Sequence, residues 1–292
     1  MTILELLHSA QEKLVSEGIS NPKTSSEILL SAVLNAQRLH LYINYNQPVT
    51  SENEKQFWEF VARRANHEPL QYILGETEFM SLPFSVNPSV FIPRPETELL
   101  VETVMEYCKI HSHKKLFRIA DIGTGSGNIA VSIAYHIPNT TVIGIDSSEK
   151  ALRIARMNAQ RNKVQNKISF LLMDVLCMNR YQSTVILEDI PFDVVVSNPP
   201  YILPVEYETL PREVQEYEPS ESLKARGEDG LEYYSTINKL AYMRLKRDGM
   251  IALEVSPTVS NQVMKILQKA DFHTIRCKQD YSHQDRIVSG IR

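Results

Sequence analysis

The spacing of apolar residues divides the chain into a helical first part and an alternating second part. In the first 75 residues apolar side chains recur at every third or fourth position, as Leu4, Leu7 and Leu14 do, which is the spacing of an amphipathic helix. The stretches 25–36 and 51–65 continue this pattern, and each begins with a serine in a capping position. Residues 1–75 are therefore predicted to form a small helical bundle.

Between residues 76 and 94 the pattern changes to short aromatic and β-branched runs broken by prolines. Such runs are typical of a β-hairpin and a linker at a domain boundary. Pro95 then stands at a first helical position, and Glu96 and Glu98 follow in the first turn, where acidic side chains favour the helix dipole. The sequence thus predicts a helix from Pro95 onward, opening a second domain over residues 95–292.

From Leu116 onward, strand-like and helix-like segments alternate. The early strands are apolar on both faces, as in a parallel sheet that helices cover on both sides, and the last two have no helix between them and should pair antiparallel. The fold class is α/β, with a seven-stranded, mostly parallel sheet that follows the bundle and the hairpin linker. The predicted strands are 116–121, 141–146, 168–174, 192–197, 250–255, 273–278 and 285–291, and the clearest helices are 147–160 and 231–246.

Composition and charge narrow the class of protein. The 292 residues carry a net charge of −4, which argues against a protein whose main task is to bind nucleic acid phosphates. The three cysteines are scattered and form no CxxC pair, so a reducing compartment is expected. No apolar run reaches the ~18 residues of a membrane span, and the first residues do not resemble a signal peptide, so the predicted location is the cytoplasm. His111 and His113 lie in a polar stretch, 111–115, which is interpreted as a solvated loop, and no metal is expected.

A glycine-rich turn stands between the first predicted strand of the sheet and the next helix. Gly123, Gly125 and Gly127 allow a positive φ and a close approach of the backbone to a ligand, although a tight turn without a ligand is the alternative. Asp146 ends the following strand, where a carboxylate can accept hydrogen bonds from both hydroxyls of a ribose. Asp174 ends the third strand, where an adenine would lie, and its alternative role is to cap a turn.

The spacing of this turn favours one nucleoside over others. Its glycines follow the pattern G-x-G-x-G rather than the G-x-G-x-x-G of nicotinamide-binding folds, and no lysine follows as in a P-loop. Asp121 precedes the turn and could pair with an ammonium group. S-adenosylmethionine has such a group and no phosphate, and the arrangement resembles the class I methyltransferases.

Asn198, Pro199, Pro200 and Tyr201 follow the strand 192–197, at the carboxyl edge of the sheet where ligands of open α/β sheets bind. The nitrogen of a planar NH2 group is a poor nucleophile, because its lone pair is delocalised. The side-chain oxygen of Asn198 and the carbonyl of Pro199 can accept its two hydrogens, while Tyr201 offers a flat face to the planar group. Both prolines stiffen the turn. An ordinary strand-ending turn is the alternative.

With these motifs in the same order, the chain resembles the HemK/PrmC family, the peptide chain release factor glutamine methyltransferases. The resemblance covers nearly the whole chain. Its segments are EPLQYILGETEF from Glu68, IPRPETELLVE from Ile92, DIGTGSGNIA from Asp121, VSNPPYI from Val196, EP at Glu218, GEDGLEYY from Gly227 and the final DRIVSGIR.

The resemblance implies transfer of a methyl group from S-adenosylmethionine, leaving S-adenosylhomocysteine, to the side-chain nitrogen of the glutamine in the GGQ motif of a class-1 release factor. The bundle would help to hold the release factor. Apart from the resemblance, a monomer is the default expectation, and neither nucleic acid nor a membrane is expected as a partner. The cofactor contacts that the resemblance implies are Gly123, Thr124, Gly125, Ser126, Gly127, Asp146 and Asn198, and the further candidates for cofactor binding are Asp121, Asp174 and Val175. The implied substrate clamp is Asn198, Pro199, Pro200 and Tyr201, and Arg94 is a further candidate, either structural or substrate-positioning.

The chain departs from the family pattern in four places. Val175 stands where the family often has an aromatic residue, 224–226 replaces a glycine-rich stretch, Ser256 replaces a glycine, and 181–190 is a slight insertion. Two other functions are alternatives. A DNA adenine or cytosine amino-methyltransferase would act on an electronically similar NH2 group, and a non-catalytic cofactor-binding scaffold would be expected to lose Asn198 or the glycine turn.

Overall fold

The computed structural model describes residues 1–180 and 191–292, so the predicted insertion at 181–190 lies outside the described residues. Contacts divide the chain into two compact units. Unit 1 consists of Met1–Glu76 together with Pro211–Tyr217, and unit 2 consists of Thr77–Leu210 together with Glu218–Arg292.

Unit 1 is helical, and its helices bury their apolar faces in one core. Leu6, Leu14, Leu30 and Phe57 are completely buried there, as expected when amphipathic helices share a core. Its helices are α1 (Ile3–Ser16), α2 (Pro22–Val33), α3 (Arg38–Ile43), α4 (Ser51–Ala65), α5 (Leu70–Leu74) and α11 (Arg212–Tyr217).

The predicted serine caps in this unit are wrong. The side chain of Thr50, not of Ser51, accepts the hydrogen bond from Asn53 N–H at the start of α4. Helix α2 begins at Pro22, earlier than predicted, and Ser25 is a buried residue inside it. Proline suits the first helical position because its missing N–H would have no partner there.

Helix α11 comes from the segment of the chain that follows the Asn-Pro-Pro-Tyr turn, yet it packs within unit 1. Arg64, whose side chain is 6% exposed, forms an ion pair with Glu213 at 2.6 Å. The hydroxyl of Tyr217 donates to the carbonyl of Asn66 at 2.7 Å. The chain therefore leaves unit 2 at Leu210 and returns to it at Glu218.

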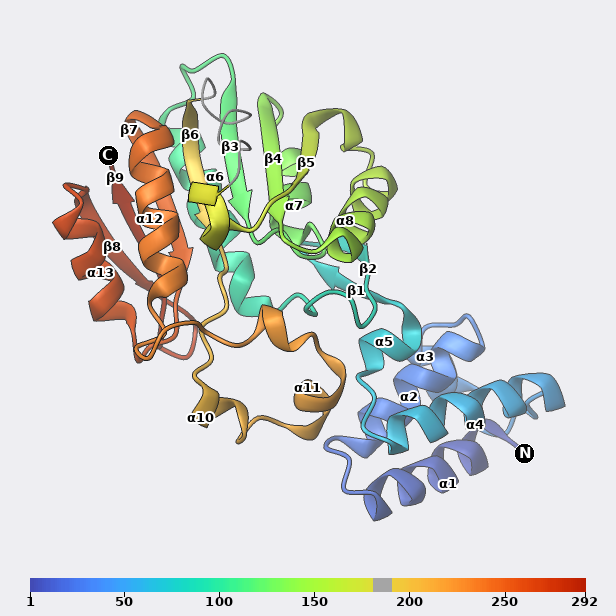
Figure 1. Cartoon of the computed structure of the whole chain (residues 1–292). Coiled ribbons are helices and arrows are strands. Elements are labelled where there is room, and N and C mark those ends of the chain that lie inside the picture. Colours follow the sequence, from blue (N-terminus) through green and yellow to red (C-terminus); the bar gives the residue numbers. More distant parts are fainter. Residues whose placement is uncertain (181–190) are drawn as a thin grey trace. The chain divides into compact units, whose positions relative to one another are not determined.

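Unit 2 contains a seven-stranded sheet with strand order β5-β4-β3-β6-β7-β9-β8 (Figure 1). Neighbouring strands from β5 to β7 are parallel, and β9 is antiparallel to both β7 and β8. This is the predicted fold. A separate pair, β1 and β2, forms the predicted hairpin. The strands are β1 (Glu76–Phe79), β2 (Leu82–Ser85), β3 (Phe117–Ile122), β4 (Thr140–Asp146), β5 (Ile168–Leu172), β6 (Phe192–Ser197), β7 (Leu245–Glu254), β8 (His273–Gln279) and β9 (Asp285–Ile291).

The central strands are apolar on both faces because each face has its own helical layer. Successive residues of β3 point to opposite faces of the sheet and enter different cores. Ile119 lies in the core that includes α6 and α7, and Ala120 lies in the core that includes α12 and α13. The helices of unit 2 are α6 (Glu98–Ile110), α7 (Asn128–His136), α8 (Glu149–Arg161), α10 (Pro204–Tyr207), α12 (Glu232–Arg244) and α13 (Ser260–Lys269), with 3-10 turns at Pro95–Thr97, Gln165–Lys167, Val175–Arg180 and Ser220–Ser222.

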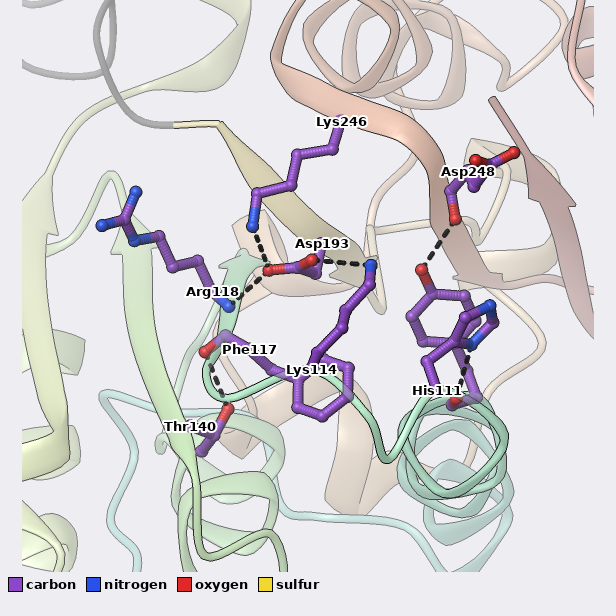
Figure 2. Close-up of polar contacts among 9 residues, drawn as sticks. His111, Lys114, Phe117, Arg118, Thr140, Asp193, Lys246 and Asp248 are labelled. Carbon is purple, nitrogen blue, oxygen red and sulfur yellow. Dashed lines mark hydrogen bonds and ion pairs between the residues drawn. The ribbon is translucent and has the colours of Figure 1, made fainter.

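The amino ends of β3 and β6 are joined by a buried carboxylate (Figure 2). Asp193 has no exposed side-chain surface and accepts hydrogen bonds from Lys114 Nζ at 2.9 Å, Lys246 Nζ at 2.7 Å and the Arg118 N–H at 2.9 Å. The interpretation of 111–115 as a solvated loop is therefore wrong for Lys114, which this carboxylate holds against the sheet. The ring of His111 also packs on Tyr107, with ring centres 4.2 Å apart.

Within residues 1–180 and 191–292, every helix is too short or too polar to cross a bilayer.

Candidate active site

The register of the parallel strands brings the predicted site residues to one edge of the sheet. Ile122 pairs with both Ile145 and Ser197, so β3, β4 and β6 end at the same level. The Ser197 hydroxyl also donates to the Ile122 carbonyl at 2.6 Å. Because parallel strands end together, the glycine turn after β3 and the Asn-Pro-Pro-Tyr turn after β6 both lie at the carboxyl edge, where ligands of such sheets bind.

The glycine turn has a backbone that requires glycine. Gly123, Gly125 and Gly127 have φ of 73°, 53° and 78°, in the left-handed region. A Cβ added at Gly127 would lie 3.0 Å from the Cβ of Ala155 in α8, so a side chain there would also collide with that helix. The turn is therefore fixed both by conformation and by packing.

Asp146, the last residue of β4, fixes the middle of this turn. Its Oδ2 accepts from the Gly125 N–H and its Oδ1 from the Ser148 N–H, each at 2.9 Å. Burial raises the pKa of Asp146, and these amide hydrogen bonds partly oppose that rise. Each carboxylate oxygen has a further lone pair, so a half-buried Asp146 can still accept hydrogen bonds from ribose hydroxyls.

Asp121 lies inside the turn. It is completely buried, and its Oδ2 accepts from the Thr124 hydroxyl at 2.6 Å and from the Ala130 N–H of α7 at 3.2 Å. Burial raises the pKa of Asp121 to about 7. Its Oδ1 has no hydrogen-bond partner in the described part of the chain. As placed, the carboxyl ties the glycine turn to α7, and a direct contact with an ammonium group would require it to become accessible.

The hydroxyl groups of the turn are also internal. Thr124 is 1% exposed and donates to Asp121, while Ser126 is 2% exposed and hydrogen-bonds Asn128 Oδ1 at 3.2 Å. Both side chains therefore stabilise the turn, and its backbone groups are what it can offer to a ligand.

Asp174 and Val175 follow β5 at the same edge. Asp174 Oδ1 accepts from the Leu176 N–H at 2.9 Å, which is the capping role that was its alternative. Val175 is 7% exposed and lies in the core formed with α12 and α13. It therefore offers little surface to a ligand.

The Asn-Pro-Pro-Tyr turn lies beside the glycine turn. A Cβ added at Gly123 would be 4.0 Å from the main-chain oxygen of Asn198. The Asn198 side chain is partly exposed and its Nδ2 donates to Thr97 Oγ1 at 3.2 Å. Pro199 is buried, Pro200 is partly buried, and the Tyr201 hydroxyl donates to Glu254 Oε1 at 3.4 Å. The four residues thus form a turn anchored at both ends and open at Asn198.

Arg94 was expected to be either structural or substrate-positioning, and its contacts agree with the structural role. Its guanidinium pairs with Glu218, which is 5% exposed, and lies 4.5 Å from the centre of the Phe91 ring. The second oxygen of Glu218 accepts from the Ile92 N–H at 3.2 Å. These contacts attach the segment before α6 to the chain that returns from α11.

Two residues that contact this site, Thr97 and Glu254, are not among those predicted from the sequence. Thr97 stands in the RPETE segment, and Glu254 is an acidic residue at the end of the otherwise apolar strand β7. Both are 1% exposed. An acid at the carboxyl end of the strand next to β6 was the signal that could have identified Glu254. No group of three or more His, Cys, Asp or Glu side chains that could hold a metal occurs in the described residues.

Comparisons with known proteins agree with this architecture. Residues 5–75 match the family model of the PrmC N-terminal domain, and residues 113–276 match that of a methyltransferase domain. The chain is 36% identical to the release factor glutamine methyltransferase of Fusobacterium nucleatum over 98% of this chain and 77% of that protein. It is 36% identical to the enzyme of the same name from Geobacter sulfurreducens, over 99% of this chain and 96% of that one.

A solved structure shows the same fold at low sequence identity. The 16S rRNA N2 G1207 methyltransferase of Thermus thermophilus, solved with AdoMet and guanosine, superposes with a TM-score of 0.51 at 15% identity. The match covers 74% of this chain and 49% of that one.

Proposed function

Because the chain belongs to the release factor glutamine methyltransferase family, we propose that it methylates the side-chain amide nitrogen of the glutamine in the GGQ motif of class-1 release factors, with S-adenosylmethionine as methyl donor. One observation carries the proposal. The Asn198 turn and the glycine turn are neighbours at the carboxyl edge of the sheet, with Gly123 next to the Asn198 carbonyl.

The residues of the glycine turn suit a nucleoside cofactor that has no phosphate. Gly123 and Gly125 leave the backbone accessible, and the Asp146 carboxylate is available to ribose hydroxyls. S-adenosylmethionine, when bound, supplies a methyl group on a positively charged sulfur. Asp121 and Asp174 act, in the proposal, mainly by fixing the shape of this pocket, since their carboxylates hold the main chain on either side of it.

The Asn198 turn would prepare the glutamine for attack. Asn198 Oδ1 and the Pro199 carbonyl accept the two amide hydrogens, which positions the nitrogen and raises its electron density. Tyr201 packs against the planar carboxamide and holds it in the plane of the two acceptors. No general base is needed for the attack itself, because the methyl group is already bound to a good leaving group; the sulfur leaves as S-adenosylhomocysteine, and the one N–H proton that the methylated nitrogen must lose passes to solvent.

We propose further that unit 1 contributes to binding of the release factor, and that the enzyme acts as a cytoplasmic monomer and releases S-adenosylhomocysteine. Helix α11 supports a role for unit 1, because it connects that unit covalently to the segment directly after Tyr201. The DNA amino-methyltransferase alternative is not favoured, because the chain has a net charge of −4 and its relatives are named for release factors.

A transfer assay tests the proposed function. Enzyme and cofactor with a radiolabelled methyl group are incubated separately with a class-1 release factor, with the same factor carrying alanine in place of the GGQ glutamine, and with duplex DNA. We expect label in the first protein alone. Label in DNA, or equal label in the two release factors, would contradict the proposal.

A further inference from the structure

The backbone of the glycine turn has little conformational preference of its own. Glycine adopts positive and negative φ about equally well, so a turn whose three glycines have φ between 53° and 78° keeps that shape only if other groups hold it. Asp146 holds the Gly125 N–H, and Asp121 holds the Thr124 hydroxyl. The next group along the turn is the Ser126 carbonyl, and it too is held from outside the turn.

Asn158 of α8 holds the Ser126 carbonyl. The Asn158 side chain is completely buried, and its Nδ2 donates to that carbonyl at 2.8 Å. The same carboxamide also contacts β2 of the hairpin. Its Nδ2 donates to the Ser85 carbonyl at 3.0 Å, and its Oδ1 accepts from the Ser85 N–H at 2.7 Å. Both hydrogens of the NH2 group and one lone pair of the oxygen are therefore in use.

This set of hydrogen bonds requires an asparagine in one orientation. Two carbonyls and one N–H are satisfied only by a side chain that donates twice and accepts once. In the reverse orientation the NH2 group of Asn158 would face the Ser85 N–H, and neither could accept from the other. Asparagine favours a helix less than alanine does, and a buried carboxamide is unfavourable unless it is hydrogen-bonded. The contacts to β2 and to the glycine turn offset both effects.

We propose that Asn158 is a positioning residue for the cofactor site, which acts through the Ser126 carbonyl to keep the glycine turn in the conformation that receives S-adenosylmethionine. This inference rests on the proposed function, because that function assigns the cofactor to the turn. Without Asn158, the buried Ser126 carbonyl would need another donor. The glycines on either side would allow the main chain to rotate toward one, and the backbone groups of the turn would then point in other directions.

The same side chain makes the hairpin part of the support of the cofactor site. Helix α8 contacts the turn at two consecutive residues, because Asn158 binds Ser126 and because Gly127 packs against Ala155. Asn158 also binds both backbone groups of Ser85, so β2 and the turn share one anchor. A displacement of β2 would therefore move the carboxamide that holds the turn.

The variant Asn158→Leu tests this role, because leucine has a similar shape but forms no side-chain hydrogen bonds. The dissociation constant of S-adenosylhomocysteine, measured by calorimetry, and the KM for S-adenosylmethionine should each rise roughly 10-fold, as when one buried hydrogen-bonding group is left without its partner. The KM for the release factor and kcat at saturating cofactor should stay within a few fold, because the substitution leaves the Asn-Pro-Pro-Tyr turn intact.

The matched control is Asn162→Leu, one turn further along α8, where the asparagine is 7% exposed. Its Nδ2 donates to the Pro83 carbonyl of β2 at 2.9 Å and to the Asn158 carbonyl at 3.0 Å, and neither acceptor belongs to the glycine turn. We expect both variants to lose thermal stability, but Asn162→Leu to keep the wild-type affinity for S-adenosylhomocysteine. Wild-type affinity in Asn158→Leu, or an equal loss of affinity in the two variants, would overturn the inference.

A second readout uses the wild-type protein, so it decides the question even if Asn158→Leu does not fold. Hydrogen exchange of the Ser85 N–H, which donates to Asn158, is measured with and without S-adenosylhomocysteine. A cofactor bound at the turn should slow this exchange several-fold. The Arg118 N–H, which donates to Asp193 at the amino ends of the strands, should change less. An unchanged rate at Ser85, or equal slowing at both amides, would overturn the inference.

A wild-type enzyme in which S-adenosylhomocysteine slows Ser85 exchange, but which transfers no methyl group to a release factor, would refute the proposed function alone. Methylation of a release factor by an Asn158→Leu enzyme with wild-type cofactor affinity would refute the inference alone.

Discussion

Two aspartates at the ends of neighbouring strands have the same predicted role but differ in burial, and therefore in what they can contact. Asp121 and Asp146 were both expected to contact the cofactor. Asp121 is completely buried and holds the glycine turn to α7, whereas Asp146 is only partly buried and keeps oxygen lone pairs for a ligand. The sequence identifies both acids, but not their accessibility, because that depends on how Thr124 and Ala130 fold back onto Asp121.

At Asn198 the account predicts a separation of catalysis from cofactor binding. Asn198→Ala removes the acceptor for the substrate amide, so turnover should fall on the order of 100-fold to 1,000-fold, as when one electrostatic contact to the reacting group is lost. Cofactor affinity, measured by calorimetry, should stay within a few fold. Asn261→Ala, at an exposed position on α13, should change neither quantity. Turnover of Asn198→Ala close to that of wild type would refute the assigned role.

The secondary-structure elements were largely predictable, because buried parallel strands are uninterrupted apolar runs bounded by polar residues. Strands β6 and β9 have the predicted ends, but β7 begins at Leu245, five residues before the predicted start at Met250. The segment that was missed contains Lys246, Arg247 and Asp248, and Lys246 belongs there because it pairs with Asp193. Polar residues at the start of a strand interrupt its apolar pattern. The ion pair that accounts for Lys246 involves a residue far away in the sequence, so no periodicity reveals it.

The ion pairs at the start of β6 should stabilise unit 2 in a pH-dependent manner. Burial would raise the pKa of Asp193, but hydrogen bonds from Lys246, the Arg118 amide and Lys114 outweigh it and place the pKa below its ordinary value. A lowered pKa gives stability that is present above the unfolded-state pKa of about 3.9 and is lost as the pH falls through the folded-state value.

Asp193→Asn should therefore lower the free energy of unfolding at pH 7 by about 2–3 kcal/mol, less than the roughly 3–5 kcal/mol for a fully buried broken pair, because both lysines are partly exposed and can turn to solvent. The difference from wild type should shrink as the pH falls below about 4. Urea unfolding at several pH values measures it, with the exposed Asp271→Asn as control. A difference that stays constant down to the acid range would contradict this origin of the stability.

At the scale of the whole molecule, the candidate site is assembled from distant parts of the chain. Thr97 and Asn198 are 101 positions apart, and Tyr201 and Glu254 are 53 apart. Pattern analysis identifies the Asn-Pro-Pro-Tyr turn, since its residues are consecutive, but it cannot identify contacts that only the strand order creates. The grouping of Pro211–Tyr217 with unit 1 is of the same kind, because seven residues carry too little pattern to show where they pack.

Mass spectrometry of the release factor tests the central claim most directly. A class-1 release factor is incubated with the enzyme and S-adenosylmethionine, digested, and its GGQ peptide is fragmented. We predict one added methyl group on the side chain of the GGQ glutamine with wild-type enzyme and none with Asn198→Ala. A methyl group on any other residue, or an equal yield from the two enzymes, would contradict the account.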